Sequence, residues 1–157
     1  MAHTAARRPG QRRAAQRLRL VEQERYAFHY PAKIGPEDLS SGGHFGTDNI
    51  ILLLSRARAH IFHSMGLAEV NLGDGATGII IVDLTVSFRA EAFPSDEIAV
   101  ETHFGAFTAK GFRIYQRMRK GGQVIALAET SVLTFDYRSR KVVPIPEGFL
   151  KAISSVL

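Results

Sequence analysis

The amino-acid sequence predicts an α+β fold in which an antiparallel sheet of about five strands packs around one long helix. The first observation behind this prediction is a helical pattern from Thr47 to Met65 that contains neither proline nor glycine. The second is a set of strand-like segments, one before this helix and four after it, joined by short turns. Short connections favour antiparallel pairing, and a single apolar helix then covers one face of the sheet.

The first strand is expected over Arg25–Lys33, where Tyr26, Phe28 and Tyr30 occupy alternate positions. This alternation is typical of a half-buried strand. Pro31 has no backbone N–H to donate, so this strand is expected at an edge of the sheet or to end there.

The long helix follows a loop of small and polar residues, 40–43, whose composition lets the backbone approach a ligand closely. Thr47 or Asp48 is expected to cap its first turn, and Gly66 is expected to end it. Apolar residues recur at helical spacing, so that the first half of the helix is expected to be buried nearly all round. They are Ile50, Ile51, Leu52, Leu53, Leu54, Ala57, Ile61, Phe62 and Met65.

Four strands and a short helix are expected after the long helix. Turn signals at Gly73–Gly75, Pro94-Ser95 and Gly121-Gly122 separate the strands. Gly105 interrupts one of them and is expected to mark a bulge. The expected strands span 76–90, 96–109, 112–119 and 123–137, and an amphipathic helix over 147–156 closes the chain.

The strand over 76–90 is expected to present two apolar-leaning faces. One face carries Ile80, Val82, Leu84, Val86 and Phe88, and the other carries Ile79, Ile81, Asp83, Thr85 and Ser87. This strand is therefore the best candidate to pair with its own copy in a dimer. Asp83 is expected to be exposed among the polar residues of its face, although pairing across a dimer would bring it towards the neighbouring subunit.

The charge of the chain is concentrated in its first residues. The chain has 157 residues, of which 20 are basic and 15 acidic, and six of the basic residues are arginines within residues 1–20. The remaining 14 basic residues nearly balance the acidic ones, so residues 21–157 are expected to form a single, almost neutral domain. A basic tail without a reading element does not indicate a nucleic-acid partner. Residues 1–20 are expected to be a flexible tail, with a mitochondrial-type targeting segment as the alternative.

The absence of cysteine excludes disulfides, thiolate catalysis and cysteine-based metal sites. His60 and His63 are spaced to share a metal on the helix, but two exposed helix residues without a ligand role is the preferred interpretation. No metal is expected. No apolar run approaches the ~18 residues of a membrane span, so we expect no membrane association and a cytoplasmic location.

The candidate site lies where the glycine-rich loop meets the long helix. The loop brings His44 and Asp48 to the amino end of this helix, whose partial positive charge and free N–H groups suit a developing anion. The imidazole of His44 is suited to general-base work near neutral pH, and the alternative is a histidine that ties down the turn. Asp48 could orient His44 or a water molecule, or cap the helix; Ser40 could hydrogen-bond a ligand, or only form the turn.

Residues 38–46 have the pattern Asp-x-x-x-Gly-Gly-His-x-Gly and lead into the long helix. This segment resembles the opening of hot-dog-fold acyl-CoA thioesterases of the 4-hydroxybenzoyl-CoA thioesterase type. The segment Phe88–Asp96 resembles the strand-to-turn segment of the same family. The resemblance spans about residues 25 to 153. It implies a hot-dog dimer or dimer of dimers, with thioester sites at the subunit interface.

The resemblance also implies roles for individual residues. The backbone N–H of Thr47 corresponds to the oxyanion donor that polarises the thioester carbonyl. Many relatives carry a catalytic carboxylate at the position of Ser40, and others carry an acid on the helix near Ser55 or Arg56, none of which is acidic here. Binding of the acyl-CoA substrate is expected to involve Gly43 in the loop and three basic residues for the coenzyme A phosphates, namely Arg89, Lys110 and Arg113.

The expected function is therefore acyl-CoA thioester hydrolysis to a free carboxylic acid and coenzyme A, which belongs to the substrate, so no separate cofactor is expected. Two alternatives remain open. One is a non-catalytic protein that binds acyl-CoA or an acyl lipid and has lost the acid at Ser40. The other is an enoyl-CoA hydratase-like enzyme, in which Asp38 and His44 would form the acid–base pair.

Overall fold

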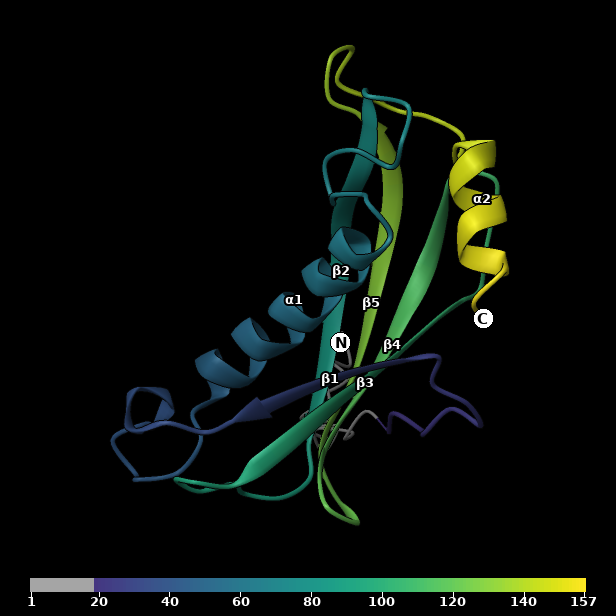
Figure 1. Cartoon of the computed structure of the whole chain (residues 1–157). Helices are drawn as coiled ribbons and strands as arrows, with labels where there is room; N and C mark the ends of the chain where they lie inside the picture. Colours follow the sequence, from purple (N-terminus) through teal and green to yellow (C-terminus); the bar gives the residue numbers. More distant parts are fainter. Residues whose placement is uncertain (1–18) are drawn as a thin grey trace, which may run out of the picture.

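The computed structural model describes residues 19–157, so the expected tail over residues 1–20, with its targeting alternative, lies almost entirely outside the described residues. Figure 1 shows the elements in their spatial arrangement. In chain order they are β1 (Phe28–Lys33), a single 3-10 turn η1 (Pro36–Asp38), α1 (Thr47–Ser64), β2 (Thr77–Phe88), β3 (Glu97–Gly105), β4 (Gly111–Lys120), β5 (Gln123–Asp136), β6 (Lys141–Val142) and α2 (Glu147–Ser154).

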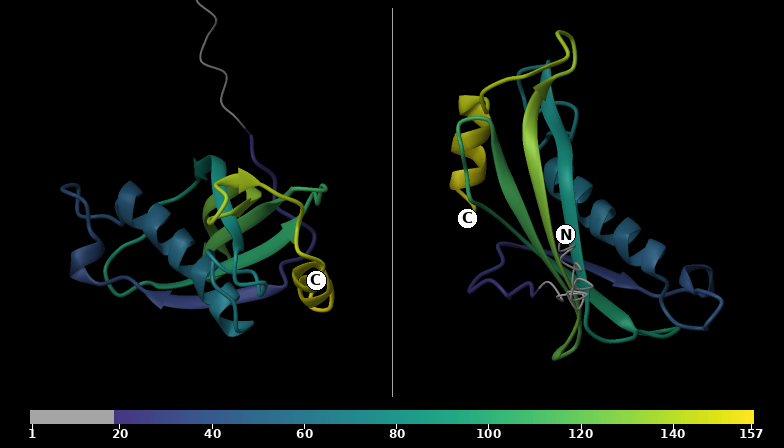
Figure 2. Two further views of the ribbon diagram at one scale, coloured as in Figure 1. Left: turned by 90° about the horizontal axis from the view of Figure 1, so that it is seen from above. Right: turned by 180° about the vertical axis from the view of Figure 1, so that it is seen from behind.

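The strands form one antiparallel sheet in the order β1-β3-β4-β5-β2, and the two-residue β6 pairs with β5. Seen from above, the strands curve around α1 (Figure 2). The expected α+β architecture is confirmed, with β6 as a sixth strand that is too short to leave a periodic pattern. Pro31 lies in the edge strand β1, as expected.

The helix α1 has the expected start and ends one residue early. Gly46 is its N-cap and no side chain caps it, so the expected capping by Thr47 or Asp48 is wrong. Burial is confined to one stripe rather than extending all round, because the side chain of Leu52 is 45% exposed. The buried residues of α1 are Ile50, Leu53, Leu54, Ala57, Arg58, Ile61 and Phe62.

Two apolar clusters hold α1 on the sheet. The first joins the amino-terminal half of α1 to β3, β4 and β5, and the second joins its carboxy-terminal half to the sheet and to α2. In the second cluster, the rings of Phe62 and Phe149 stack with their centroids 6.0 Å apart. Between the two halves, the buried amide of Gln116 in β4 donates to the carbonyl of Leu54 at 2.9 Å. Because this hydrogen bond is directional, it fixes the position of α1 along the sheet as well as its depth.

A β-bulge changes the two faces of β2. The pairing with β5 shifts between Ile81 and Asp83, so that Val82 is the extra residue. Residues opposite one another on paired strands share a face. The apolar residues on the α1 side are therefore Ile79, Ile81, Leu84, Val86 and Phe88. The expected assignment of Ile79 and Ile81 to the opposite face from Leu84 is wrong, because the extra residue Val82 interrupts the alternation. Asp83 is exposed with polar neighbours, as expected.

The expected bulge at Gly105 is also wrong, because β3 pairs regularly with β4 up to Gly105 and ends there. A second irregularity instead lies between Met118 and Arg119 of β4, opposite β5. The other strands follow the expected segments to within a few residues.

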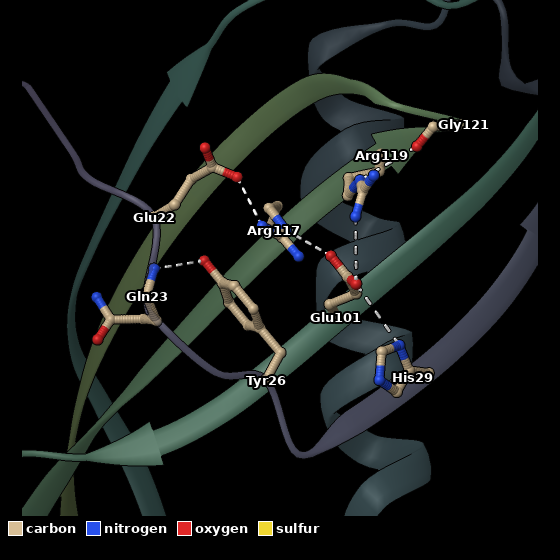
Figure 3. Close-up of polar contacts among 8 residues, drawn as sticks. All are labelled: Glu22, Gln23, Tyr26, His29, Glu101, Arg117, Arg119 and Gly121. Atoms are coloured by element: carbon tan, nitrogen blue, oxygen red, sulfur yellow. Dashed lines mark hydrogen bonds and ion pairs between the residues drawn. The ribbon is translucent and has the colours of Figure 1, made fainter.

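The face of the sheet opposite α1 carries a charged network that joins the amino-terminal segment to the strands (Figure 3). The guanidinium of Arg117 binds the carboxylates of Glu101 at 2.5 Å and Glu22 at 2.6 Å, and it lies 4.4 Å from the ring centroid of Tyr26. The hydrogen bond to Glu101 raises the pKa of Arg117 above its ordinary value. These contacts hold residues 20–26 against the outer face of the sheet. They are made by charged and polar groups rather than by residues of the apolar core.

Gly78 in β2 allows the turn of residues 69–71 to lie directly against the strand. A Cβ at this position would lie 2.4 Å from the carbonyl oxygen of Glu69 and 2.6 Å from Cα of Val70, both backbone atoms. We expect Gly78→Ala to lower the free energy of unfolding by about 1–3 kcal/mol, the usual cost of overpacking, as measured by urea denaturation. Gly122→Ala is the control, since a Cβ there meets nothing within 4 Å. Equal stability of the two variants would contradict the packing described here.

Candidate active site

The loop before α1 is a closed turn. Leu39 and Phe45 form an antiparallel bridge. Within it, the carbonyl of His44 accepts the backbone N–H of Ser40 at 2.9 Å and the hydroxyl of Ser40 at 3.2 Å. Gly43 has φ +74°, a left-handed conformation that favours glycine, so glycine at this position is required by the turn itself.

The imidazole of His44 packs over Gly42. A Cβ at Gly42 would lie 3.0 Å from Cδ2 and 3.1 Å from Nε2 of His44, so a side chain at this position would displace the ring. The ring is partly exposed and makes no hydrogen bond or ion pair with any other described residue. His44 is therefore held by its backbone, while both ring nitrogens are available to a ligand.

Two backbone hydrogen bonds fasten this turn to the rest of the molecule. The N–H of Phe45 donates to the carbonyl of Ala92 at 2.8 Å, and the N–H of Gly46 donates to the carbonyl of Asp38 at 3.1 Å. The first of these bonds joins the loop to the segment that follows β2, although the two lie 47 positions apart in the sequence. The start of α1 and the end of β2 consequently form one corner of the fold.

The amino end of α1 presents backbone N–H groups at this corner. Its first intrahelical bond runs from the N–H of Ile50 to the carbonyl of Gly46 at 2.9 Å. The N–H groups of residues 47–49 precede that bond and have no carbonyl partner within the helix. Because no side chain caps them, they can serve an anion or a polarised carbonyl oxygen.

A pocket of about 270 Å³ opens at the corner. One wall comes from the loop and helix start, and the other comes from the end of β2. The lining residues are His44, Phe45, Thr47, Ile50, Phe88, Arg89, Ala90 and Glu91. Such a volume holds a thioester group with a short portion of its acyl chain and a water molecule, whose share of liquid volume is about 30 Å³.

The structure thus brings three of the sequence-predicted residues together, namely His44, Thr47 and Arg89. Gly43 and Ser40 belong to the adjoining turn, and the hydroxyl of Ser40 is engaged with the His44 carbonyl. Asp48 is exposed at the second position of α1 and does not line the pocket.

Lys110 and Arg113 lie elsewhere in the same chain. Phe88, at the pocket, pairs with Ala126 of β5, whereas Arg113 is level with Ser131, five residues further along that strand. At ~3.4 Å per residue this separation is roughly 17 Å. Arg113 also pairs with the carboxylate of Glu129 at 2.9 Å. Within one chain, neither basic residue reaches the pocket.

Arg89 points its guanidinium towards the outer face. Its Nε donates to the hydroxyl of Ser87 at 2.9 Å, and its Nη2 donates to the carbonyl of Leu20 at 2.6 Å. Arg89 therefore connects the rim of the pocket to the amino-terminal segment held on the outer face.

Sequence reasoning assigned no role to Glu91, which is the only carboxylate among the described residues that line the pocket. The available signal was an acid between two alanines directly after a long strand, within a segment already singled out for its resemblance. The turn that follows it is fixed by Asp96. Hydrogen bonding from the N–H of Phe93, and next the contact with Lys120, lower the pKa of Asp96 from its ordinary value.

No group of three or more potential metal ligands occurs within residues 19–157. In the same part of the chain, neither helix combines the length and the apolar character needed to cross a bilayer.

An antiparallel sheet curved around one long helix defines the hot-dog fold, and in this protein a pocket lies at the start of that helix. The sequence pattern of the Thioesterase-like superfamily matches residues 34–153, and the chain belongs to this superfamily. The family expected from the sequence is thereby confirmed. Among curated proteins, no sequence match was found.

Solved structures of thioesterases share the fold. A 1,4-dihydroxy-2-naphthoyl-CoA thioesterase from Synechocystis is similar with a TM-score of 0.74 at 20% identity, covering 82% of this chain and 96% of the other. A gentisyl-coenzyme A thioesterase has a TM-score of 0.70 at 23% identity, covering 80% and 99%. A protein from Staphylococcus aureus, solved in complex with CoA, has a TM-score of 0.75 at 15% identity and covers 82% of each chain.

The serine pair in the loop offers a direct test of the turn. We expect Ser40→Ala to lower the free energy of unfolding by about 0.5–1.5 kcal/mol, because it removes one of the two hydrogen bonds to the His44 carbonyl. Ser41→Ala is the matched control, since Ser41 is exposed and its hydroxyl makes no hydrogen bond with the described residues. Urea denaturation of both variants gives the comparison, and an equal loss in Ser41→Ala would show that Ser40 is not the fastening residue.

Proposed function

We propose that this protein hydrolyses an acyl-CoA thioester to a free carboxylic acid and coenzyme A. The observation that carries the proposal is the pocket in which His44 faces the uncapped amino end of α1. Membership of the thioesterase-like superfamily supports it. So do the similar structures, which include two CoA thioesterases and a protein bound to CoA.

The proposed chemistry uses the backbone for the carbonyl and a side chain for water. The thioester oxygen lies at the start of α1, where the N–H of Thr47 stabilises the negative charge of the tetrahedral intermediate; a single donor of this kind contributes ~3–4 kcal/mol. His44 takes part in proton transfer at the attacking water or the departing thiolate. Asp48, at the second position of α1, adds a carboxylate near the same end and is a candidate for orienting water at the pocket mouth. This scheme needs no group beyond the protein, water and the substrate.

Binding of coenzyme A involves the rim rather than the interior, because the pocket is too small for the nucleotide. Gly43 lets the backbone approach the substrate closely, and Arg89 is the arginine or lysine among the described residues that line the pocket. Lys110 and Arg113 would reach the phosphates only from a second subunit, given their distance along the sheet.

We also propose a homodimer formed through β2, which could associate further into a dimer of dimers. β2 is an edge strand of the described sheet and has large apolar side chains that stay exposed, with Ile81 48%, Val82 51% and Leu84 40% exposed. A long edge strand with exposed apolar side chains favours pairing with a copy of itself. Such pairing would place a second subunit beside the pocket, next to Phe88. We expect the protein to act in the cytoplasm, on the grounds of composition.

The test of the proposed function is steady-state hydrolysis of a panel of aliphatic and aromatic acyl-CoA thioesters, followed by thiol release. We expect His44→Ala to reduce kcat by about 100-fold or more on the best substrate, the usual contribution of a general acid or base. Binding of a non-hydrolysable thioester should be preserved. His63→Ala is the control, because His63 is exposed at the far end of α1.

Three outcomes would contradict this proposal. Tight binding of acyl-CoA without turnover of any panel member would indicate a binding protein. Hydration of crotonyl-CoA, seen as loss of its absorbance, without thioester cleavage would indicate a hydratase. Equal activity of the His44 and His63 variants would remove His44 from the mechanism.

The proposed dimer has its own test. We expect Leu84→Lys to convert the dimer to a monomer in light scattering coupled to size-exclusion chromatography, because a charge would be buried against the paired strand. Val156→Lys is the control, since Val156 is 42% exposed and follows α2 rather than β2. A dimer that survives Leu84→Lys but not Val156→Lys would place the interface elsewhere.

A further inference from the structure

We propose that Glu91 is the catalytic carboxylate of this site, accepting the proton of the water molecule that attacks the thioester. This inference rests on the proposed hydrolytic function and names the base that the function requires.

Glu91 and His44 stand on opposite walls of the same pocket. His44 comes from the loop before α1, and Glu91 follows the end of β2 by three residues. Phe45 follows His44 and Ala92 follows Glu91, and the backbone N–H of Phe45 donates to the carbonyl of Ala92. The two side chains therefore extend from backbone segments that are in direct contact. The pocket lies between them, and the start of α1 belongs to the same wall as His44.

The other acids near the loop, and the hydroxyl of Ser40, are engaged or lie outside the pocket. The carboxylate of Asp38 accepts the N–H of Gly35 at 2.9 Å, which holds it in the η1 turn. The hydroxyl of Ser40 donates to the His44 carbonyl. Asp48 is exposed and absent from the lining. Among the described residues of the pocket wall, Glu91 is left as the group that can act as a carboxylate base.

The carboxylate of Glu91 is also unpaired. It makes no hydrogen bond or ion pair within residues 19–157, and the neighbouring Arg89 directs its guanidinium to Ser87 and Leu20 instead. An exposed carboxylate without a cationic partner keeps its lone pairs available, whereas a salt-bridged one would be weakened as a base. Exposure at the pocket mouth also gives water direct access to it.

The step balances without any further reagent. The water oxygen bonds to the thioester carbonyl carbon as one of its protons passes to the Glu91 carboxylate. The carbonyl oxygen becomes the oxyanion held at the start of α1. The intermediate then collapses, the C–S bond breaks with its electron pair on sulfur, and the proton held by Glu91 passes through the imidazole of His44 to the thiolate. The products are the carboxylic acid and the free thiol of coenzyme A.

The experiment compares Glu91→Gln with the wild-type protein on the best acyl-CoA substrate. We expect kcat to fall by about 100-fold or more, while binding of a non-hydrolysable thioester stays within about twofold. A base that is protonated at acid pH lowers the rate there. If Glu91 is that base, the fall in rate at acid pH seen with the wild-type protein should be absent in Glu91→Gln. Glu97→Gln is the control, since it makes the same substitution at an exposed position at the start of β3 and should leave kcat unchanged.

A second variant distinguishes a catalytic role from a structural one. In Glu91→Ala, the vacated space can admit a small carboxylate, so added formate should restore a concentration-dependent part of the turnover. A residue that only shapes the pocket would not respond to formate, and that result would overturn the proposal.

The remaining outcomes separate this inference from the proposed function. If the wild-type protein hydrolyses acyl-CoA and Glu91→Gln retains more than half of kcat, Glu91 is not the base and the function stands. If Asp48→Asn lowers kcat by about 100-fold and Glu91→Gln does not, Asp48 accepts the proton and the inference is overturned. If the wild-type protein cleaves no thioester, the proposed function fails and the inference fails with it.

Discussion

The hydrogen bond from Phe45 to Ala92 is the constraint on which the site depends. It is a single backbone contact of 2.8 Å, yet it joins the loop before the helix to the segment after the longest edge strand. Without this contact, the start of α1 would still carry its unpaired N–H groups and His44 would still sit on its glycine turn. They would not, however, face a second wall, and no pocket would form between them.

The core explains why this contact can hold its geometry. α1 cannot slide along the sheet, because Gln116 donates to a carbonyl in the middle of the helix and apolar clusters fill the space on either side. Its amino end is therefore delivered to a fixed place. The loop itself is closed by hydrogen bonds to its own carbonyls, so the ring of His44 needs no side-chain partner to stay in position. Rigid backbone elements thus carry the site, while its polar side chains remain available.

Local patterns in the sequence were sufficient for both helices and for the places of β1 to β5 along the chain. Neither proline nor glycine interrupts α1, and β-branched residues alternate along the strands, so both periodicities were visible. What the sequence could not supply depends on contacts between distant segments. The bulge at Val82 arises from the pairing of β2 with β5, and its effect is to bring Ile79 and Ile81 to the face that carries Leu84, Val86 and Phe88. Capping by Gly46 was missed because polar neighbours offered a more usual cap than glycine.

The candidate site shows the same division. His44 and the helix start were predicted because they adjoin in sequence, and the glycine pattern is specific enough to indicate a family. Glu91 lies 47 residues from His44, and only the bond between Phe45 and Ala92 brings the two walls together. Conversely, Lys110 and Arg113 were grouped with the site by their charge and their place near strand ends, and neither feature tells which end of the sheet a residue occupies.

The arrangement also explains how a serine can stand where relatives are expected to carry a carboxylate. In the proposed mechanism, stabilisation of the oxyanion comes from backbone N–H groups, which depend on the helix and not on any side chain. The base needs only to reach a water molecule beside the same carbonyl, and a pocket with two walls offers two places from which it can do so. A carboxylate at the end of β2 and one on the loop would approach that water from opposite sides. Loss of the acid at position 40 therefore leaves the helix start unchanged, and Glu91 is already placed on the other wall.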